Sequence, residues 1–150
     1  MNKLVFFYRI VMVSLFTILF TMFVQFIING IVEVDSQNVT VTKLPFFKFV
    51  FLAPALESLI SFMVILVLAN FFGGKITSIF IGLLWGGLHS TMLYGLYQVG
   101  FFIITFSAFY LYSRLYFHYR NYSIFIAVIS MLIPHSLHNL YVFILSMKYT

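Results

Sequence analysis

Four side chains able to bind protons, metals or anions lie within long apolar segments of this chain. A carboxylate in the middle of a membrane-spanning helix costs about 2.5–3.5 kcal/mol even on a lenient insertion scale, so Glu57 has either a partner or a use. The plainer alternative is a protonated Glu57 that hydrogen-bonds a neighbouring helix as structural glue. Polar groups at similar depth on three segments are most simply explained by one shared cavity. The four residues are Glu57, His89, His135 and Asn139.

Spacing and residue type leave three kinds of chemistry open for this cluster. His135 and Asn139 are four residues apart and therefore project from one face of a helix, whereas His138 either joins them or packs elsewhere. The carboxylate can act as general base on water while the other groups stabilise an oxyanion. Alternatively, Glu57, His89 and His135 bind a divalent metal such as zinc. Proton or ion relay ranks last, because it needs polar groups across the full membrane thickness.

Two prolines interrupt the apolar segments beside these polar residues. Pro54 and Pro134 each remove a helical N–H and clash with the carbonyl four residues earlier, at Val50 and Ser130 respectively. Membrane helices tolerate such breaks where neighbours, hydroxyls or water satisfy the freed groups. The two breaks predict a wet cavity, and the alternative is an ordinary proline kink.

The elements that position these residues are predicted to be membrane-spanning helices. Of the 150 residues, 63% are hydrophobic and 7% are charged, which is too little charge to cover a soluble domain. Because a span takes roughly 20 apolar residues, we predict an all-α membrane protein, a polytopic bundle of about five transmembrane helices in a single domain over residues 1–150. The first span is too long for a signal peptide and is expected to be retained. The spans lie at about 8–32, 46–71, 76–97, 99–117 and 123–147.

The basic residues lie at the ends of the apolar segments rather than in one patch. The net charge of +5 therefore predicts orientation in a membrane, with a cytoplasmic N-terminus, and no nucleic-acid partner. The absence of cysteine excludes disulfides and Cys-ligated metals. Five basic residues would face the cytoplasm and three the outside: Lys3, Arg9, Lys75, Arg114 and Arg120 against Lys43, Lys48 and Lys148.

Two further patterns concern the packing of the segments. Gly82, Gly86 and Ser90 repeat at small-xxx-small spacing, which predicts a close helix contact next to His89. A group of tyrosines near Arg114 predicts an aromatic belt at one membrane interface. These tyrosines are Tyr110, Tyr112, Tyr116, Tyr119 and Tyr122.

Three short motifs resemble those of the CAAX prenyl protease and bacteriocin-processing (CPBP, or Abi) family of intramembrane proteases. Residues 53–62, which contain Glu57, resemble the first motif, EExxxR. Residues 85–89 resemble the second, FxxxH, with Trp85 for the aromatic residue and His89 as its end. His135 and Asn139 match the third, HxxxN. The resemblance covers the segments at about 46–147, with the segment at about 8–32 as an accessory helix.

This resemblance implies a glutamate-dependent intramembrane endopeptidase in a bacterial cytoplasmic membrane. Glu57 would activate water with the help of His89, while His135 and Asn139 would stabilise the oxyanion. Family members cleave prenylated CAAX tails or, in bacteria, process or protect against peptides such as bacteriocins. The expected partners are therefore the lipid bilayer and a peptide or membrane-protein substrate. The resemblance leaves open whether a metal takes part.

The chain departs from the family pattern at two positions of the first motif. Ser58 and Phe62 stand where the family has a second Glu and an Arg. Losing both together avoids stranding one buried charge, so folding need not suffer. The alternative function is thus a catalytically inactive member that binds peptides or confers bacteriocin immunity. The chain is also short for the prenyl-protease branch, which leaves room for a membrane partner or a homo-oligomer.

Overall fold

The computed structural model describes residues 2–31, 45–91 and 93–147. These ranges are helical and contain no strand. The structure confirms the prediction of an all-α bundle of about five helices. Its elements are α1 (Lys3–Ile31), the π-helical turn η2 (Lys48–Leu52), α2 (Ala53–Leu68), α3 (Gly74–Ser90), α4 (Gly95–Tyr119) and α5 (Ile124–Ser146).

Most of these helices have the length and composition of membrane spans. Among the described residues, 4 helical segments are long and apolar enough to cross a membrane: α1, the continuous segment Lys48–Leu68, α4 and α5. Large apolar side chains such as Phe26 and Phe71 lie on the outer surface, where lipid is a better solvent for them than water. The chain is therefore an integral membrane protein. The fifth helix, α3, has only 17 residues.

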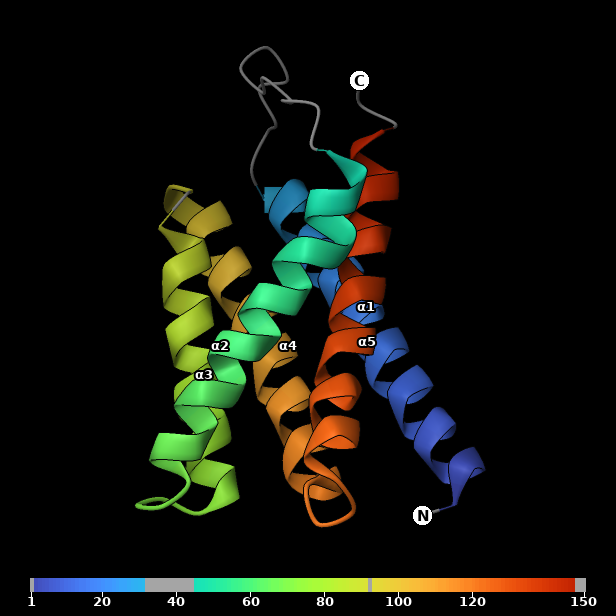
Figure 1. The fold of residues 1–150 in the computed structure, drawn as a ribbon. Coiled ribbons are helices and arrows are strands. Elements are labelled where there is room, and N and C mark those ends of the chain that lie inside the picture. The colour runs from blue at the N-terminus through green and yellow to red at the C-terminus, as the bar shows by residue number, and fades with distance from the viewer. Residues whose placement is uncertain (1, 32–44, 92, 148–150) are drawn as a thin grey trace.

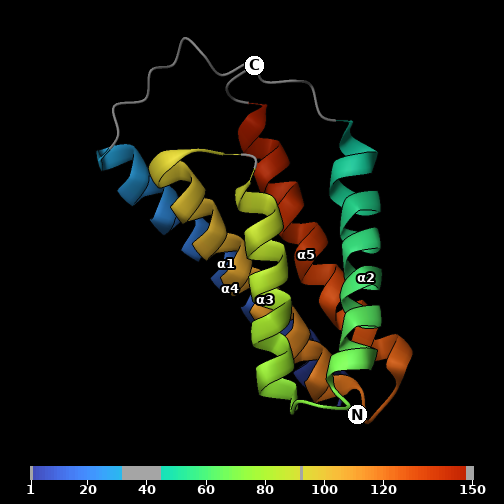
Figure 2. The ribbon, with the colours of Figure 1, turned by 90° about the vertical axis from the view of Figure 1, so that its left-hand side faces the viewer.

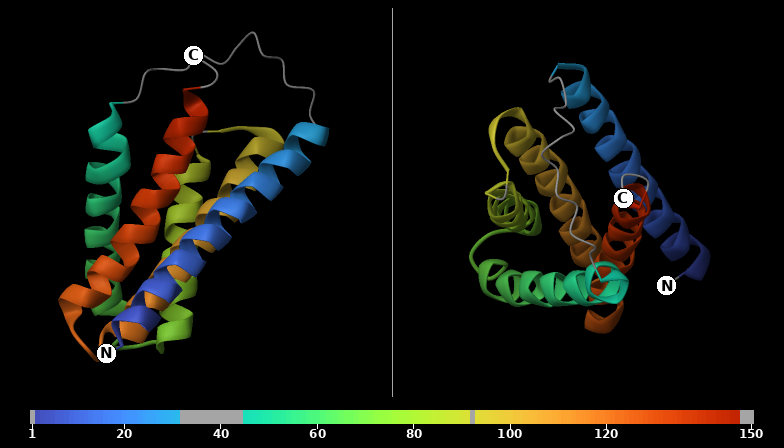
Figure 3. Two further views of the ribbon diagram at one scale, coloured as in Figure 1. Left: turned by 90° about the vertical axis from the view of Figure 1, so that its right-hand side faces the viewer. Right: turned by 90° about the horizontal axis from the view of Figure 1, so that it is seen from above.

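Successive helices alternate in direction through the bundle (Figure 1). The start of α1, the turn between α2 and α3, and the turn between α4 and α5 share one end of the molecule. Helix α4 lies centrally and contacts α3, α5 and α1, as the rotated view in Figure 2 and the view from above in Figure 3 also show. Helix α2 is tilted, so that it contacts α5 and α3.

The contact between α3 and α4 depends on two glycines. A Cβ atom at Gly82 would lie 2.8 Å from the backbone oxygen of Phe106, and one at Gly86 would lie 3.1 Å from the ring of Phe102. These separations are shorter than ordinary van der Waals contact, so neither glycine can be replaced without moving a helix or a ring. The small-xxx-small spacing thus correctly predicted a close helix contact, and its partner is α4.

The predicted end of the third span, at about 97, is wrong. Helix α3 ends at Ser90 and α4 begins at Gly95. Gly95 has a φ of +62°, a conformation that glycine adopts without the steric cost of a side chain. Because α3 stops early, His89 lies in its last turn rather than near the middle of a span.

The predicted aromatic belt is also wrong for three of its tyrosines. Tyr112, Tyr116 and Tyr119 are buried, with 1–3% of their surface exposed, whereas Tyr122 is 57% exposed. The reason is the central position of α4, whose successive turns carry these three side chains into the core. Residues 33–43, which include the chain's other two acidic residues, Glu33 and Asp35, lie outside the described residues, as does Lys148.

Candidate functional site

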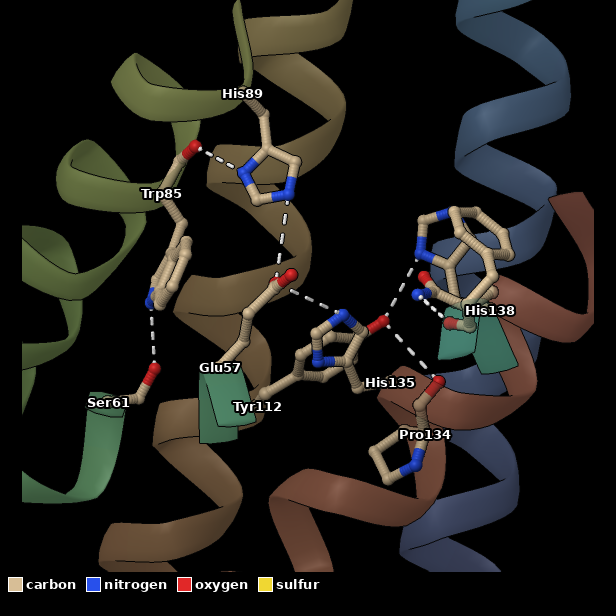
Figure 4. A network of polar contacts seen from close by, with 10 residues as sticks. Glu57, Ser61, Trp85, His89, Tyr112, Pro134, His135 and His138 are labelled. Carbon is tan, nitrogen blue, oxygen red and sulfur yellow. Dashed lines mark hydrogen bonds and ion pairs between the residues drawn. The ribbon is translucent and has the colours of Figure 1, made fainter. Parts of the chain in front are cut away.

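Three of the four predicted site residues meet inside the bundle. In Figure 4, Glu57 of α2 points between His89 of α3 and His135 of α5. The Glu57 Oε2 atom lies 3.7 Å from Nε2 of His89 and 3.5 Å from Nε2 of His135. These separations are long for direct hydrogen bonds, and a water molecule beside the three groups could contact all of them.

The orientation of His89 is fixed by the preceding turn of α3. Its Nδ1 lies 3.0 Å from the carbonyl oxygen of Trp85. A carbonyl only accepts, so Nδ1 carries the proton and the Nε2 lone pair of the neutral ring faces Glu57. Trp85 is itself held by α2, because its Nε1–H donates to Ser61 Oγ at 2.8 Å. Its ring also stacks on Phe109 of α4, with 5.0 Å between the ring centroids. Trp85 therefore connects α2 to α3 and positions His89.

The ring of His135 is packed between two aromatic side chains of α4. Phe109 contacts it edge-on, with 4.9 Å between the ring centroids, and Tyr112 stacks on it, with 5.5 Å between the centroids. Its buried Nδ1 atom has no hydrogen-bond partner within the described part of the chain. A proton on Nδ1 would therefore be unpaired, which favours the tautomer with the proton on Nε2, facing Glu57. The two histidines thus present a lone pair and an N–H to the same carboxylate.

His138 belongs to a separate hydrogen-bonded chain. Its Nδ1 lies 3.2 Å from the Tyr112 hydroxyl and its Nε2 lies 3.1 Å from Thr21 Oγ1. The Thr21 hydroxyl donates to the carbonyl of Thr17 at 2.8 Å. Because Thr21 donates to Thr17, the Nε2–H of His138 donates to Thr21. Tyr112 then donates to Nδ1, which is nearer than its other acceptor, the Pro134 carbonyl at 3.4 Å. His138 therefore joins α5 to α1 and α4, which settles its contacts where the spacing alone left them open.

Asn139 contacts the backbone of the π-helical turn. Its Nδ2 donates to the carbonyl of Phe49 at 2.9 Å. In η2 the amide of Ala53 bonds to the carbonyl of Lys48, so the next amide in this register belongs to Pro54, which has no N–H. The carbonyl left without a helical partner is thus that of Phe49 and not that of Val50 as predicted, because the π register shifts each partner by one residue.

A cavity of about 140 Å³ adjoins this cluster. A water molecule occupies about 30 Å³ in the liquid, so the cavity has room for several. Helix α1, an addition in the family resemblance, contributes Thr21 and Gln25 to the wall. These two residues and Tyr112 were not predicted as site residues from the sequence, although Thr17 and Thr21 are hydroxyl-bearing residues one helical turn apart in an apolar segment. The wall includes Glu57, His89, His135, His138, Asn139, Thr21, Gln25, Tyr112, Phe101, Ile104, Phe109 and Val142.

No other charged side chain of the described residues shares the cavity with Glu57. Ser58 is buried, and Phe62 packs against the ring of Tyr116 at 5.9 Å. Glu57 is the one acidic residue of the described ranges. In those ranges, no group of three or more His, Cys, Asp or Glu side chains has the arrangement of a metal site. No protein-family model, curated protein or solved structure matches this chain.

Proposed function

We propose that this chain is an intramembrane endopeptidase of the CPBP type, in which Glu57 activates water. One observation carries the proposal. The Glu57 carboxylate lies within 3.7 Å of two imidazole nitrogens and lines a cavity large enough for several waters. Its Oε2 atom is buried and has no hydrogen-bond partner among the described residues. A buried acceptor of this kind is suited to take a proton from a bound water.

The attacking water would lie in the cavity beside the carboxylate and the two rings. Glu57 Oε2 accepts one hydrogen of this water, and the Nε2 lone pair of His89 accepts the other. These two contacts fix the direction of the water's lone pair toward a substrate carbonyl. General-base catalysis by a positioned carboxylate contributes about 10²–10⁴-fold to the rate.

His135 and Asn139 would stabilise the oxyanion that forms on the substrate oxygen. The Nε2–H of His135 faces the reaction centre, and its largely apolar surroundings strengthen the interaction with a developing negative charge. Asn139 has two amide hydrogens, of which one is bonded to Phe49, so the second is free to donate. When the C–N bond breaks, the proton that Glu57 took from water passes to the leaving amine, and the carboxylate is restored.

The surroundings of the site suit an apolar substrate segment. Phe101, Ile104 and Val142 form part of the cavity wall, and Glu57 lies in the middle of the segment Lys48–Leu68. A peptide or a membrane-protein segment that enters from the bilayer would meet apolar side chains before the carboxylate. The proposal includes a bacterial cytoplasmic membrane with the N-terminus inside, because the basic residues gather at the end where α1 begins.

The Glu57→Gln variant tests this proposal. Glutamine keeps the size of the side chain and cannot take a proton, so turnover falls by about 10²–10⁴-fold. The purified protein is reconstituted into liposomes with detergent-extracted membrane proteins of the expression host, and new N-termini are identified by mass spectrometry. We expect cleavage within apolar segments by the unaltered chain and by the matched control Glu33→Gln. Full activity of a folded Glu57→Gln variant refutes the proposal.

Departures from the family's first motif favour a second function, which is peptide binding or bacteriocin immunity without catalysis. Ser58 and Phe62 replace the family's second Glu and its Arg, and Phe62 is packed against Tyr116. No charge of the described residues therefore assists Glu57. Cells that express the chain are challenged with a panel of membrane-active bacteriocins. Protection that survives Glu57→Gln indicates binding, whereas protection lost with Glu57→Gln indicates proteolysis.

A further inference from the structure

A basic groove lies between α1 and α4, away from the candidate site. It is lined by residues from the first half of α1 and from the C-terminal part of α4. Its volume is about 300 Å³. One part of its lining is cationic or polar and the other part is aliphatic. The lining residues are Arg9, Arg114 and His118, with Met12, Val13, Leu111 and Leu115.

The polar part of the groove is a built arrangement of side chains from both helices. Arg114 and His118 are four residues apart and project from the same face of α4. Arg9 of α1 reaches across, and its Nη1 donates to Nε2 of His118 at 2.6 Å. Both arginines are exposed, so their remaining guanidinium N–H groups are accessible to a ligand. Two cations therefore line one groove.

No described carboxylate neutralises these two cations. Glu57, the one acidic residue of the described ranges, contacts His89 and His135 in the central cavity. Like charges that share a groove repel each other, and an anion between them removes the repulsion. The planar guanidinium groups present paired N–H donors that match the oxygens of a phosphate. The groove thus has the charge and the donors of a phosphate-binding site.

We propose that this groove binds one anionic phospholipid. The phosphate accepts hydrogen bonds from Arg9 and Arg114, and one acyl chain lies on the aliphatic side of the groove. A lipid fits better than a free anion, because Met12, Val13 and Leu115 provide an apolar surface directly beside the cations. The groove also opens at one end of membrane-spanning helices, at the level where headgroups lie. This site is independent of any peptidase activity.

Lipid titration of the full chain in detergent micelles, followed by native mass spectrometry, tests the proposal. We expect phosphatidylglycerol to bind with a stoichiometry of one and more tightly than phosphatidylcholine. A basic residue near a lipid surface is worth about 1 kcal/mol, which is about fivefold in affinity. Arg9→Gln and Arg114→Gln should each weaken phosphatidylglycerol binding about fivefold, and the double variant about 25-fold. The matched control Lys75→Gln removes an exposed charge at the same end and should change binding less than about twofold.

Each alternative gives a different outcome. If Lys75→Gln weakens phosphatidylglycerol binding as much as Arg9→Gln or Arg114→Gln, the lipid is attracted by overall charge and the proposal of a specific site is wrong. Competition by millimolar inorganic phosphate shows a free-phosphate site and overturns the lipid assignment. Met12→Trp keeps both arginines and fills the aliphatic side, so it weakens phosphatidylglycerol binding if an acyl chain lies there, and unchanged binding refutes that placement. Circular dichroism and gel filtration of every variant confirm that it is folded.

Discussion

Two histidines one helical turn apart on α5 are both buried, yet their surroundings differ. His138 has partners for both ring nitrogens, Tyr112 and Thr21, at 3.2 and 3.1 Å. His135 has no partner for Nδ1 within the described chain, and its Nε2 lies 3.5 Å from Glu57. The polar groups around His138 are thus satisfied by the fold, and those around His135 are not.

This difference separates a structural role from a chemical one. A buried polar atom without a partner costs about 1–3 kcal/mol, so folding alone favours the arrangement seen at His138. The Oε2 atom of Glu57 is a second buried atom without a partner, and it faces the same gap as His135. Two groups that line one cavity and each carry a buried atom without a partner indicate a site that is completed by water or substrate. The chemistry is therefore expected on the His135 side.

The largest expected effect comes from the matched pair His135→Phe and His138→Phe. Phenylalanine keeps a ring in each place. In His135→Phe the proposed oxyanion donor is lost, so the proposed peptidase activity falls about 10²–10³-fold. The free energy of unfolding is unchanged or higher, because an unpaired buried nitrogen is gone. In His138→Phe the hydroxyls of Tyr112 and Thr21 each lose one hydrogen bond but keep the carbonyls of Pro134 and Thr17. At about 0.5–1.5 kcal/mol for each lost bond, the free energy of unfolding falls by about 1–3 kcal/mol.

Activity in liposomes and unfolding in a denaturing detergent measure the two effects separately. If His135→Phe unfolds more easily than His138→Phe, His135 is the structural residue and the assignment of roles is wrong. The assignment is also wrong if His138→Phe, assayed below its unfolding midpoint, loses as much activity as His135→Phe.

Glu57→Leu is expected to raise the free energy of unfolding, by less than His138→Phe lowers it. A leucine in the middle of a span is favourable, whereas a carboxylate costs about 2.5–3.5 kcal/mol there. The gain in unfolding free energy is smaller than this, about 1–2 kcal/mol, because the Glu57 side chain is 18% exposed and is partly solvated by the cavity. Stabilisation together with loss of activity is the signature of a strained functional group. Destabilisation by Glu57→Leu, measured in the same unfolding assay, indicates that Glu57 is structural glue.

The convergence of Glu57, His89 and His135 was predictable from sequence because rare polar side chains in lipid must share a cavity. The contact of Asn139 with Phe49 was not, since it depends on a π-helical turn that no sequence pattern indicated. The sequence also placed Tyr112 at the membrane interface, because tyrosines beside basic residues usually lie there. Only the packing of α4 at the centre of the bundle shows that this hydroxyl is buried beside His138.

The smallest expected change in stability comes from Asn139→Leu, which distinguishes the roles of the two amide hydrogens of Asn139. Asn139→Leu leaves the Phe49 carbonyl unpaired and lowers the free energy of unfolding by about 0.6 kcal/mol, the average for hydrogen bonds between membrane helices, and by at most about 1.7 kcal/mol. Pro54→Ala restores an N–H in the register of that carbonyl, so Asn139→Leu should cost less stability in the Pro54→Ala background. If the second amide hydrogen serves the oxyanion, the loss of activity persists in that background even though the structural cost is removed. Recovery of activity together with stability instead assigns Asn139 to the backbone contact alone, and His135 is then the sole oxyanion donor of the proposed mechanism.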